Sequence, residues 1–152
     1  MDKTLITNNK AHINYFEIDK YECGIVLKGN EVKSLFNSQA NITDSYVLIS
    51  HDEAYIVNMY IAPYEKHNTF YKILPTRRRK LLLNKSEIIK ISHQIKKYHL
   101  TLIPTIAYVK NNKIKINVIL AKHKKSHDKR NDIKNKQNDR YLSKVAKYIK
   151  QI

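Results

Sequence analysis

Residues 101–120, TLIPTIAYVKNNKIKINVIL, are the stretch of the sequence that decides the fold class. Two runs rich in β-branched and other apolar side chains, residues 101–109 and 114–120, predict β-strands. Between them lie Asn111 and Asn112, and asparagine tolerates the left-handed backbone that a tight turn demands. The second half of the chain therefore contains a predicted β-hairpin.

Further strands are predicted toward the N-terminus. Residues 16–28 combine apolar and aromatic side chains with partial alternation, which is typical of a strand. Residues 46–49 and 54–57 flank the polar tetrapeptide SHDE and predict a second hairpin. Another strand is predicted over residues 59–62, where it stops before a proline, and the polar residues 64–76 predict a loop that is a candidate for mobility.

Two helices are predicted between these strands. Residues 30–38 carry apolar side chains at helical spacing and predict a short amphipathic helix capped by Asn30. A longer helix follows Asn84, which suits an N-cap because Glu87 stands three residues later. This helix should end at His99, and its apolar face comprises Ile88, Ile91 and Ile95, with Ile89 alongside.

Five or more short strands, one short helix and one longer helix within about 120 residues predict a mainly β fold with α-helical appendages. An oligonucleotide-binding-type closed β-barrel is a natural candidate, although the pattern supports the mainly β class better than that topology. We therefore assign residues 1–121 to a barrel-like domain.

The composition changes at Lys122. Residues 122–140 contain one aliphatic side chain, Ile133, so this stretch cannot bury enough apolar surface to offset the entropy lost on ordering. Residues 142–152 place apolar side chains on one helical face and lysines on the other. We predict that residues 122–152 form a basic tail that is disordered when free and helical on a partner.

The net charge of +16 is distributed unevenly. Residues 1–76 hold seven Lys and Arg against nine Asp and Glu, whereas residues 77–152 hold 22 against four. Ile, Lys and Asn have AT-rich codons, but uniform codon drift does not produce this polarity. A one-sided basic surface is typical of a polyanion-binding protein, with nucleic acid the leading partner and an anionic membrane surface the weaker one.

RNA is a better candidate than duplex DNA. The chain has 11 tyrosines, and exposed tyrosines stack on unpaired bases while lysines contact phosphates. Most of the tyrosines are expected to pack in the core. The sequence shows neither a helix-turn-helix pattern nor zinc-finger spacing.

The residues argue against most enzyme classes. Two glycines cannot supply a Walker loop or a dinucleotide-binding loop. His123 and His127 have the i, i+4 spacing of metal ligands, but no third ligand follows, so we expect no metal and no cofactor. The acidic residues of the first half do not form a recognisable nuclease arrangement, so an enzyme such as a nuclease is the minority hypothesis.

The expected location is the cytoplasm. One cysteine, Cys23, cannot form an internal disulfide, which suits a reducing compartment. The first ten residues lack the apolar core of a signal peptide, and no apolar run approaches the length of a membrane span. We expect a soluble protein without a membrane partner.

Several strings resemble, in order, the SsrA-binding protein or small protein B (SmpB) family, the protein partners of tmRNA. The most specific are EVKSL at residues 31–35, RKLLL at 79–83 and HDKR at 127–130. Further matches along nearly the whole chain are NKA at 9–11, YECGIVL at 21–27, GN at 29–30, ANITDSYV at 40–47, PYE at 63–65 and RR at 77–78, with Ser126 before HDKR.

The resemblance implies an oligonucleotide-binding barrel with about three flanking helices and a basic tail. It also implies binding to the tRNA-like domain of tmRNA, delivery of that RNA to stalled ribosomes, and trans-translation with peptide tagging. The implied partners are tmRNA, the ribosome with its ribosomal RNA, and elongation factor Tu with aminoacyl-tmRNA. The protein is expected to be a monomer, and its tail to enter the vacant mRNA channel.

The resemblance carries RNA-contact roles onto named positions. Glu22 would accept hydrogen bonds from base or ribose edges and Lys115 would contact phosphate, whereas Leu82 could equally be a core residue and Asn84 only a helix cap. Weaker candidates for the same surface are Asn9, Lys10, Arg79 and Lys80. In the tail, the ribosomal decoding-region contacts would be His127, Asp128, Lys129 and Arg130.

The chain departs from the family pattern at one position. His123 stands between two basic residues where the family commonly has glycine, which would permit an unusual backbone turn. The departure puts the tail function in doubt but not RNA binding. An RNA-binding or ribosome-associated protein without tmRNA is the alternative, since it explains the charge but not the order of the motifs.

Overall fold

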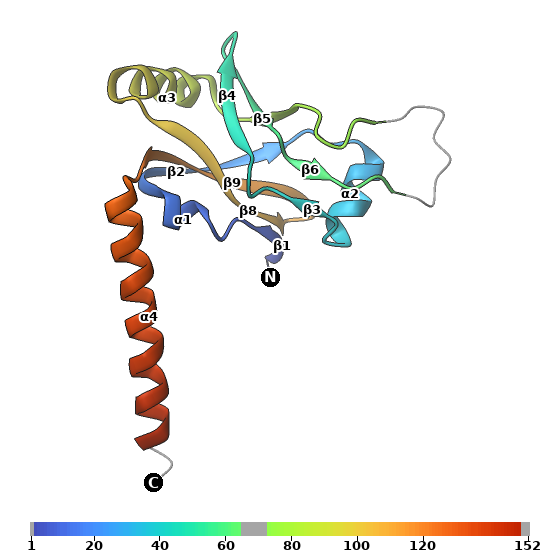
Figure 1. The fold of residues 1–152 in the computed structure, drawn as a ribbon. Coiled ribbons are helices and arrows are strands. Elements are labelled where there is room, and N and C mark those ends of the chain that lie inside the picture. Colours follow the sequence, from blue (N-terminus) through green and yellow to red (C-terminus); the bar gives the residue numbers. More distant parts are fainter. Residues whose placement is uncertain (1, 65–72, 150–152) are drawn as a thin grey trace.

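The computed structural model describes residues 2–64 and 73–149 (Figure 1). Strands dominate the first 123 residues, and a long helix follows them. In chain order, the elements are β1 Lys3–Thr7, α1 Ala11–Asn14, β2 Tyr15–Ile25, α2 Gly29–Phe36, β3 Ala40–Asn41, β4 Tyr46–Ser50, β5 Glu53–Val57, β6 Tyr60–Ile61, β7 Arg79–Leu82, α3 Lys85–Tyr98, β8 Thr101–Lys110, β9 Lys113–His123 and α4 Ser126–Ile149.

The main sheet is antiparallel throughout and has the strand order β1-β8-β4-β5-β7-β2-β9. Because β8 also pairs with β9, six of these strands close into a ring, and β1 is added at one edge of β8. Strands β3 and β6 form a separate two-stranded sheet. The predicted mainly β class is confirmed.

Both predicted hairpins are present. Asn111 and Asn112 join β8 to β9 with positive φ angles of 50° and 60°. His51 and Asp52 join β4 to β5 in the same way, with φ angles of 51° and 59°. Two successive left-handed residues match the right-handed twist of the paired strands, so these turns fix the register of each hairpin.

Helix α3 begins and ends as predicted. The backbone N–H of Asn84 donates to Glu87 Oε2 at 3.1 Å. The helix ends at His99 in the left-handed conformation, and Ile88 and Ile91 are its buried residues. Ile89, which the helical pattern places beside them, is 55% exposed.

The predicted cap of the first amphipathic helix is wrong by two residues. Helix α2 begins at Gly29, and Lys28 rather than Asn30 is the residue that precedes it. The reason is that Glu31 turns its carboxylate back and accepts a hydrogen bond from the Lys28 backbone N–H at 2.9 Å. Asn30 therefore lies inside the first turn.

Three strands were not predicted. The two-residue strand β3 pairs with β6. Strand β1 pairs with residues 106–109 of β8, a partner about 100 residues away. Strand β7 carries the basic run into the ring between β5 and β2. Most of the loop predicted over residues 64–76 lies outside the described residues.

The core fills the inside of the ring. Its fully buried members include Cys23, Ile56, Leu102 and Ile116, from four of the ring strands. A second, smaller cluster joins Ala11 of α1 to Ile103, Ile119 and Ala121. Helix α1 therefore covers one part of the strand surface.

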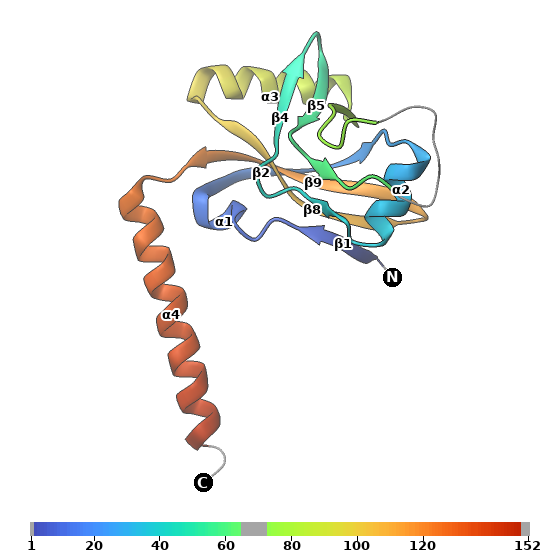
Figure 2. The ribbon, with the colours of Figure 1, turned by 45° about the vertical axis from the view of Figure 1, so that its right-hand side comes forward.

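Helix α4 extends away from the strands in both ribbon views (Figures 1 and 2). It follows β9 after two residues, Lys124 and Lys125, and β9 itself runs to His123, two residues beyond the boundary predicted for the tail. Whether the helix forms before the tail meets a partner stays a prediction. Within residues 2–64 and 73–149, no helix combines the length and apolarity of a membrane span.

Candidate nucleic-acid interface

Three adjacent strands bring the main predicted contact residues onto one outward face. Gly24 of β2 lies opposite Leu82 of β7 on one side and opposite Lys115 of β9 on the other. Paired residues share a face, and so do residues two apart on one strand, so Glu22 joins this face and the buried Cys23 points inward. Asn84 follows Leu82 by two residues, at the start of α3. We call Glu22, Gly24, Leu82, Asn84 and Lys115 the β2 face.

Glycine at position 24 makes room on this face. A Cβ built on Gly24 would lie 3.3 Å from Leu82 Cδ1, so the leucine side chain occupies the space over the glycine. Gly24 has no positive φ, so space rather than backbone conformation explains its presence. Leu82 remains 55% exposed, which makes it a surface residue and not a core residue.

Glu22 is fixed in place by two side chains of β8. Tyr108 Oη donates to Glu22 Oε2, and Lys110 Nζ lies 3.2 Å from the same oxygen. Both hydrogen bonds lower the pKa of Glu22, and the one from Tyr108 has the larger effect. Burial and the neighbouring carboxylate raise the pKa of Tyr108 in turn. At neutral pH the site therefore presents a carboxylate anion of defined orientation beside a neutral phenol.

This combination suits an RNA surface. An oriented carboxylate accepts hydrogen bonds from exocyclic amines or from a ribose 2′-hydroxyl, and it repels phosphate. Lys115 of β9 supplies the opposite charge. It lies opposite Gly24, which follows Glu22 by two residues, and a phosphate oxygen is the natural ligand of its ammonium group. On an RNA-binding surface, such a carboxylate would contribute selectivity and such an ammonium group would contribute attraction.

Lys80 extends the β2 face along β7. It precedes Leu82 by two residues and therefore shares its side of the strand. Its Nζ lies 2.8 Å from Glu53 Oε1, and Tyr55 Oη donates to the other oxygen of that carboxylate. Together with Leu82, Lys85 and His51, Lys80 lines a surface hollow between β7 and the β4–β5 hairpin.

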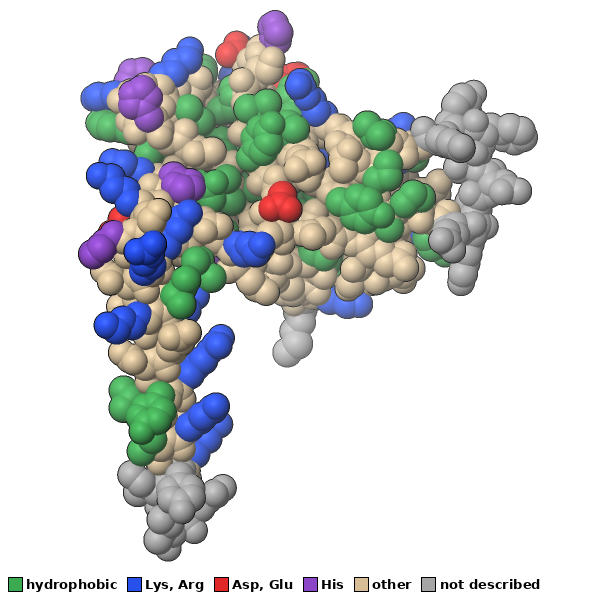
Figure 3. All heavy atoms as spheres, in the orientation of Figure 1, with side chains coloured by type: hydrophobic (Ala, Val, Ile, Leu, Met, Phe, Trp, Pro, Cys, Tyr) green, Lys and Arg blue, Asp and Glu red, His purple; other side chains and the backbone are tan. Residues whose placement is uncertain are grey.

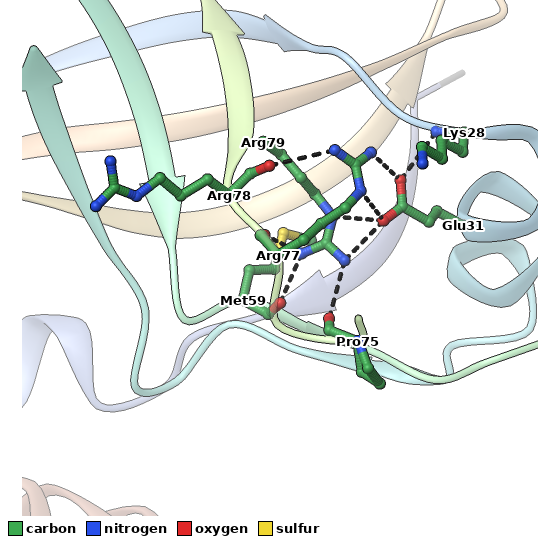
Figure 4. A network of polar contacts seen from close by, with 7 residues as sticks. All are labelled: Lys28, Glu31, Met59, Pro75, Arg77, Arg78 and Arg79. Atoms are coloured by element: carbon green, nitrogen blue, oxygen red, sulfur yellow. Dashed lines mark hydrogen bonds and ion pairs between the residues drawn. The ribbon is translucent and has the colours of Figure 1, made fainter. Parts of the chain in front are cut away.

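Arg79 is not available to a ligand. It is 1% exposed, and its Nη2 lies 2.8 Å from Glu31 Oε1. Its guanidinium also donates to the carbonyls of Met59 and Pro75, at 2.6 and 2.9 Å, as Figure 4 shows. The inward register of β7 explains the burial, since Arg79 alternates with the outward Lys80. We therefore remove Arg79 from the predicted RNA contacts.

Asn9 and Lys10 lie apart from the β2 face, just before α1, and both are exposed. Asn9 lines a cleft together with Lys20 of β2 and with Lys136 and Arg140 of α4. Lys20 precedes Glu22 by two residues and shares its face. This lysine therefore connects the cleft to the β2 face.

The tail motif lies where α4 leaves the strands. His127, Asp128, Lys129 and Arg130 occupy its first turns, and His127 is exposed with its Nδ1 3.4 Å from Asn131 Nδ2. Figure 3 shows Lys and Arg side chains along the rest of the helix. The motif and the β2 face are thus separate surfaces.

His123 does not need the backbone freedom of glycine. It is the last residue of β9, it pairs with Tyr15, and it is absent from the residues with positive φ. The two rings meet edge to face, with centroids 5.2 Å apart. The unusual turn that a glycine would permit is therefore not used here.

Sequence reasoning missed Tyr108, Lys110 and Lys20. Tyr108 and Lys110 alternate at the end of a predicted strand, a signal that they share a face, but only the β8–β9 and β2–β9 pairings bring them beside Glu22. No group of three metal-ligating side chains occurs among residues 2–64 and 73–149.

Comparison with known proteins gives consistent matches. The family model described as "SmpB protein" matches residues 5–148. An SsrA-binding protein of Malacoplasma penetrans is 51% identical over 142 residues, covering 93% of this chain and 97% of the relative. An SsrA-binding protein of Persephonella marina is 48% identical and covers 95% of each chain.

A solved structure has the same fold. It is described as "tmRNA-SmpB: a journey to the center of the bacterial ribosome", and its matching chain superposes with a TM-score of 0.65 at 38% identity. The match covers 80% of this chain and 85% of the other.

Proposed function

The chain belongs to the SmpB protein family, and from this premise we propose that it binds tmRNA and acts with the ribosome in the rescue of stalled translation. The family is one of RNA-binding factors, so the protein acts by binding and not as an enzyme. We further propose that the ring of strands is an oligonucleotide-binding-type barrel and that residues 1–121 form the RNA-binding domain.

The observation that carries the proposal is the β2 face. Four residues that the family resemblance assigns to RNA contact, Glu22, Leu82, Asn84 and Lys115, come from three separate parts of the chain and meet around Gly24. Their chemistry is complementary to a structured RNA: a fixed acceptor, an apolar contact, an amide and a cation. We assign the tRNA-like domain of tmRNA to this face, with Lys80 at its border and Asn9 and Lys10 at the far end.

The tail completes the proposed function. Helix α4 carries seven Lys and Arg against three Asp, and ribosomal RNA is a polyanion that can neutralise it. We assign contacts in the decoding region to His127, Asp128, Lys129 and Arg130, with the tail in the vacant mRNA channel. The protein would act as a monomer in the cytoplasm, and elongation factor Tu would accompany the aminoacylated tmRNA.

Affinity for RNA tests the first step. The chain should bind the tRNA-like domain of tmRNA more tightly than an unrelated hairpin of equal length. Equal affinities would show that binding depends on charge alone and is not specific to tmRNA. Binding should weaken with salt by roughly 0.7–0.9 log units per log unit of salt for each phosphate neutralised.

Removal of residues 126–152 separates the two surfaces. We expect the shortened chain to keep its affinity for the tRNA-like domain and to lose peptide tagging on stalled ribosomes. Loss of RNA binding itself would favour a general RNA-binding protein that uses the tail as its main anchor. Labelled RNA incubated with the full chain, with and without Mg²⁺, should stay intact, since cleavage would favour the nuclease hypothesis.

A further inference from the structure

Lys124 is the most buried lysine of the described residues, at 7% exposure, although it lies in the short link between β9 and α4. Its Nζ donates to the carbonyl oxygen of His12 at 2.9 Å and forms an ion pair with Asp132 of α4. The same ammonium group lies 4.8 Å from the centroid of the Phe16 ring. One cation thus contacts α1, β2 and α4 at once.

The backbone of this residue is held as well. The N–H of Lys124 donates to the carbonyl oxygen of Asn14 at 2.8 Å, so the link is fixed at the end of α1. By contrast, the next residue, Lys125, is exposed, and its side chain has no partner in the described part of the chain. The two adjacent lysines therefore have the same charge and very different surroundings.

Helix α4 has few other contacts with the body. Asp132 is partly buried, and every described side chain from Ile133 to Lys147 is exposed. Because a helix rises 1.5 Å per residue, the part of α4 from Asp132 to its end at Ile149 is about 26 Å long. A swing of about 20° at its base would therefore displace the far end by about 9 Å.

Electrostatic repulsion opposes this arrangement. Among the described residues, the cleft between α4 and the body is lined by Lys20 on one side and by Lys136 and Arg140 on the other, and no carboxylate lines it. Like charges across a cleft push the helix away from the body. The ion pair between Lys124 and Asp132 is the attractive contact that counters this repulsion near the pivot.

We infer that Lys124 is a positioning residue, which fixes through Asp132 the direction in which the basic helix leaves the RNA-binding domain. This inference rests on the proposed function, because the direction of α4 matters only if the body and the tail must engage two RNA surfaces together. Lys124 itself needs no contact with RNA, and its burial against three elements leaves it little access to one.

A distance measurement tests the geometry without any functional assay. Nitroxide labels are placed on Ser86→Cys in α3 and Tyr141→Cys in α4, both exposed positions, in a chain whose buried Cys23 is replaced by Ser. We expect a narrow distribution of distances in the parent and in Lys125→Met, and a broad or shifted one in Lys124→Met. A parent distribution as broad as that of Lys124→Met would overturn the inference.

Function is measured on the same substitutions without the labels. Lys124→Met should lower peptide tagging about tenfold, because the loss of hydrogen bonds to a charged group shifts an equilibrium by about that factor. Affinity for the tRNA-like domain should stay within about twofold of the parent, since Lys124 is remote from the β2 face. Lys124→Arg retains the charge and the donors and should restore most of the tagging.

Asp132→Asn provides a second test on a more exposed residue that is less critical for folding. It should lower tagging in the same direction, whereas Asp139→Asn, the same change on the exposed part of α4, should not. If removal of residues 126–152 abolishes tagging while Lys124→Met and Asp132→Asn do not lower it, the positioning role is wrong and the proposed function stands. If the parent does not prefer the tRNA-like domain over the control hairpin, the proposed function fails first.

Discussion

Leu82 lies across Gly24 of the neighbouring strand, so close that a methyl group on the glycine would meet Leu82 Cδ1 at 3.3 Å. The contact joins β7 to β2 at the centre of the proposed RNA surface. It places an exposed apolar side chain over the glycine backbone, between Glu22 and Lys115. A side chain at position 24 would push Leu82 aside.

We predict that Gly24→Ala lowers affinity for the tRNA-like domain by several-fold with little loss of stability. The new methyl group displaces the end of a flexible side chain by a few tenths of an ångström, and the backbone at Gly24 has an ordinary φ. Binding isotherms and thermal melts measure the two effects. Gly29→Ala is the matched control, because a Cβ there meets nothing within 4 Å. Equal effects of the two substitutions would contradict a special role for Gly24.

Glu22→Ala should weaken binding to the tRNA-like domain although it makes the protein more basic. The expected loss is about tenfold, the size of a hydrogen bond to a charged group. Glu53→Ala is the matched control, because Glu53 also accepts hydrogen bonds from a tyrosine and a lysine, Tyr55 and Lys80, away from the centre of the β2 face. A tighter complex for Glu22→Ala would mean that the carboxylate only repels RNA.

The Glu31 network should make stability depend on pH. Burial by itself raises the pKa of Glu31, but hydrogen bonds from Arg77, the Lys28 backbone and Arg79 outweigh it and hold the pKa below 4.5. A lowered pKa in the folded state means that this stabilisation is present above pH 4.5 and is lost as the pH falls through the folded-state value. Urea unfolding between pH 7 and pH 3 should show this loss, and Glu31→Gln should flatten it.

Removal of the Glu31 side chain should also be costly at neutral pH. Glu31→Ala leaves the guanidinium of Arg79 buried without its carboxylate partner, which costs about 3–5 kcal/mol for a buried ion pair. Glu17→Ala, at an exposed position, should cost little. A change below about 1 kcal/mol in Glu31→Ala would show that the network contributes little to folding.

His123→Gly should lower stability slightly and leave tmRNA binding unchanged. The substitution removes the ring contact with Tyr15 and places glycine in a strand, and each effect costs about 0.5–1 kcal/mol. Since the backbone at His123 is already an ordinary strand, we expect tagging to stay at the level of the parent. Higher tagging in His123→Gly would show that histidine restricts the tail.

Local signals in the sequence were sufficient for the hairpins and for α3. Asn111 and Asn112, and Asn84 with Glu87, act within a few residues of one another, so their chemistry can be deduced from the chain alone. Leu82 was ambiguous because a run of three leucines does not show which one points inward. The β2–β7 pairing resolves this by placing Leu82 opposite Gly24.

Long-range contacts account for what was missed. Arg79 lies in a run of basic residues, which is typical of an exposed segment. Its guanidinium can be buried because Glu31 of α2 supplies a carboxylate partner. Strand β1 has one buried apolar side chain, Leu5, so its pattern is weak, and its pairing with β8 depends on residues 106–109. The family resemblance names Glu22, Leu82, Asn84 and Lys115, and the pairings of β2 with β7 and β9 bring these residues together.

The pairing of β2 with β9 also affects how the protein is made. Tyr15 is synthesised more than 100 residues before its strand partner His123, and the ring cannot close until β9 has been synthesised. Contacts so distant in sequence form slowly, and an incomplete chain exposes unpaired strand edges. A nascent chain that stops before Lys113 therefore cannot complete its fold, so this protein can mature only where its own translation runs almost to the end.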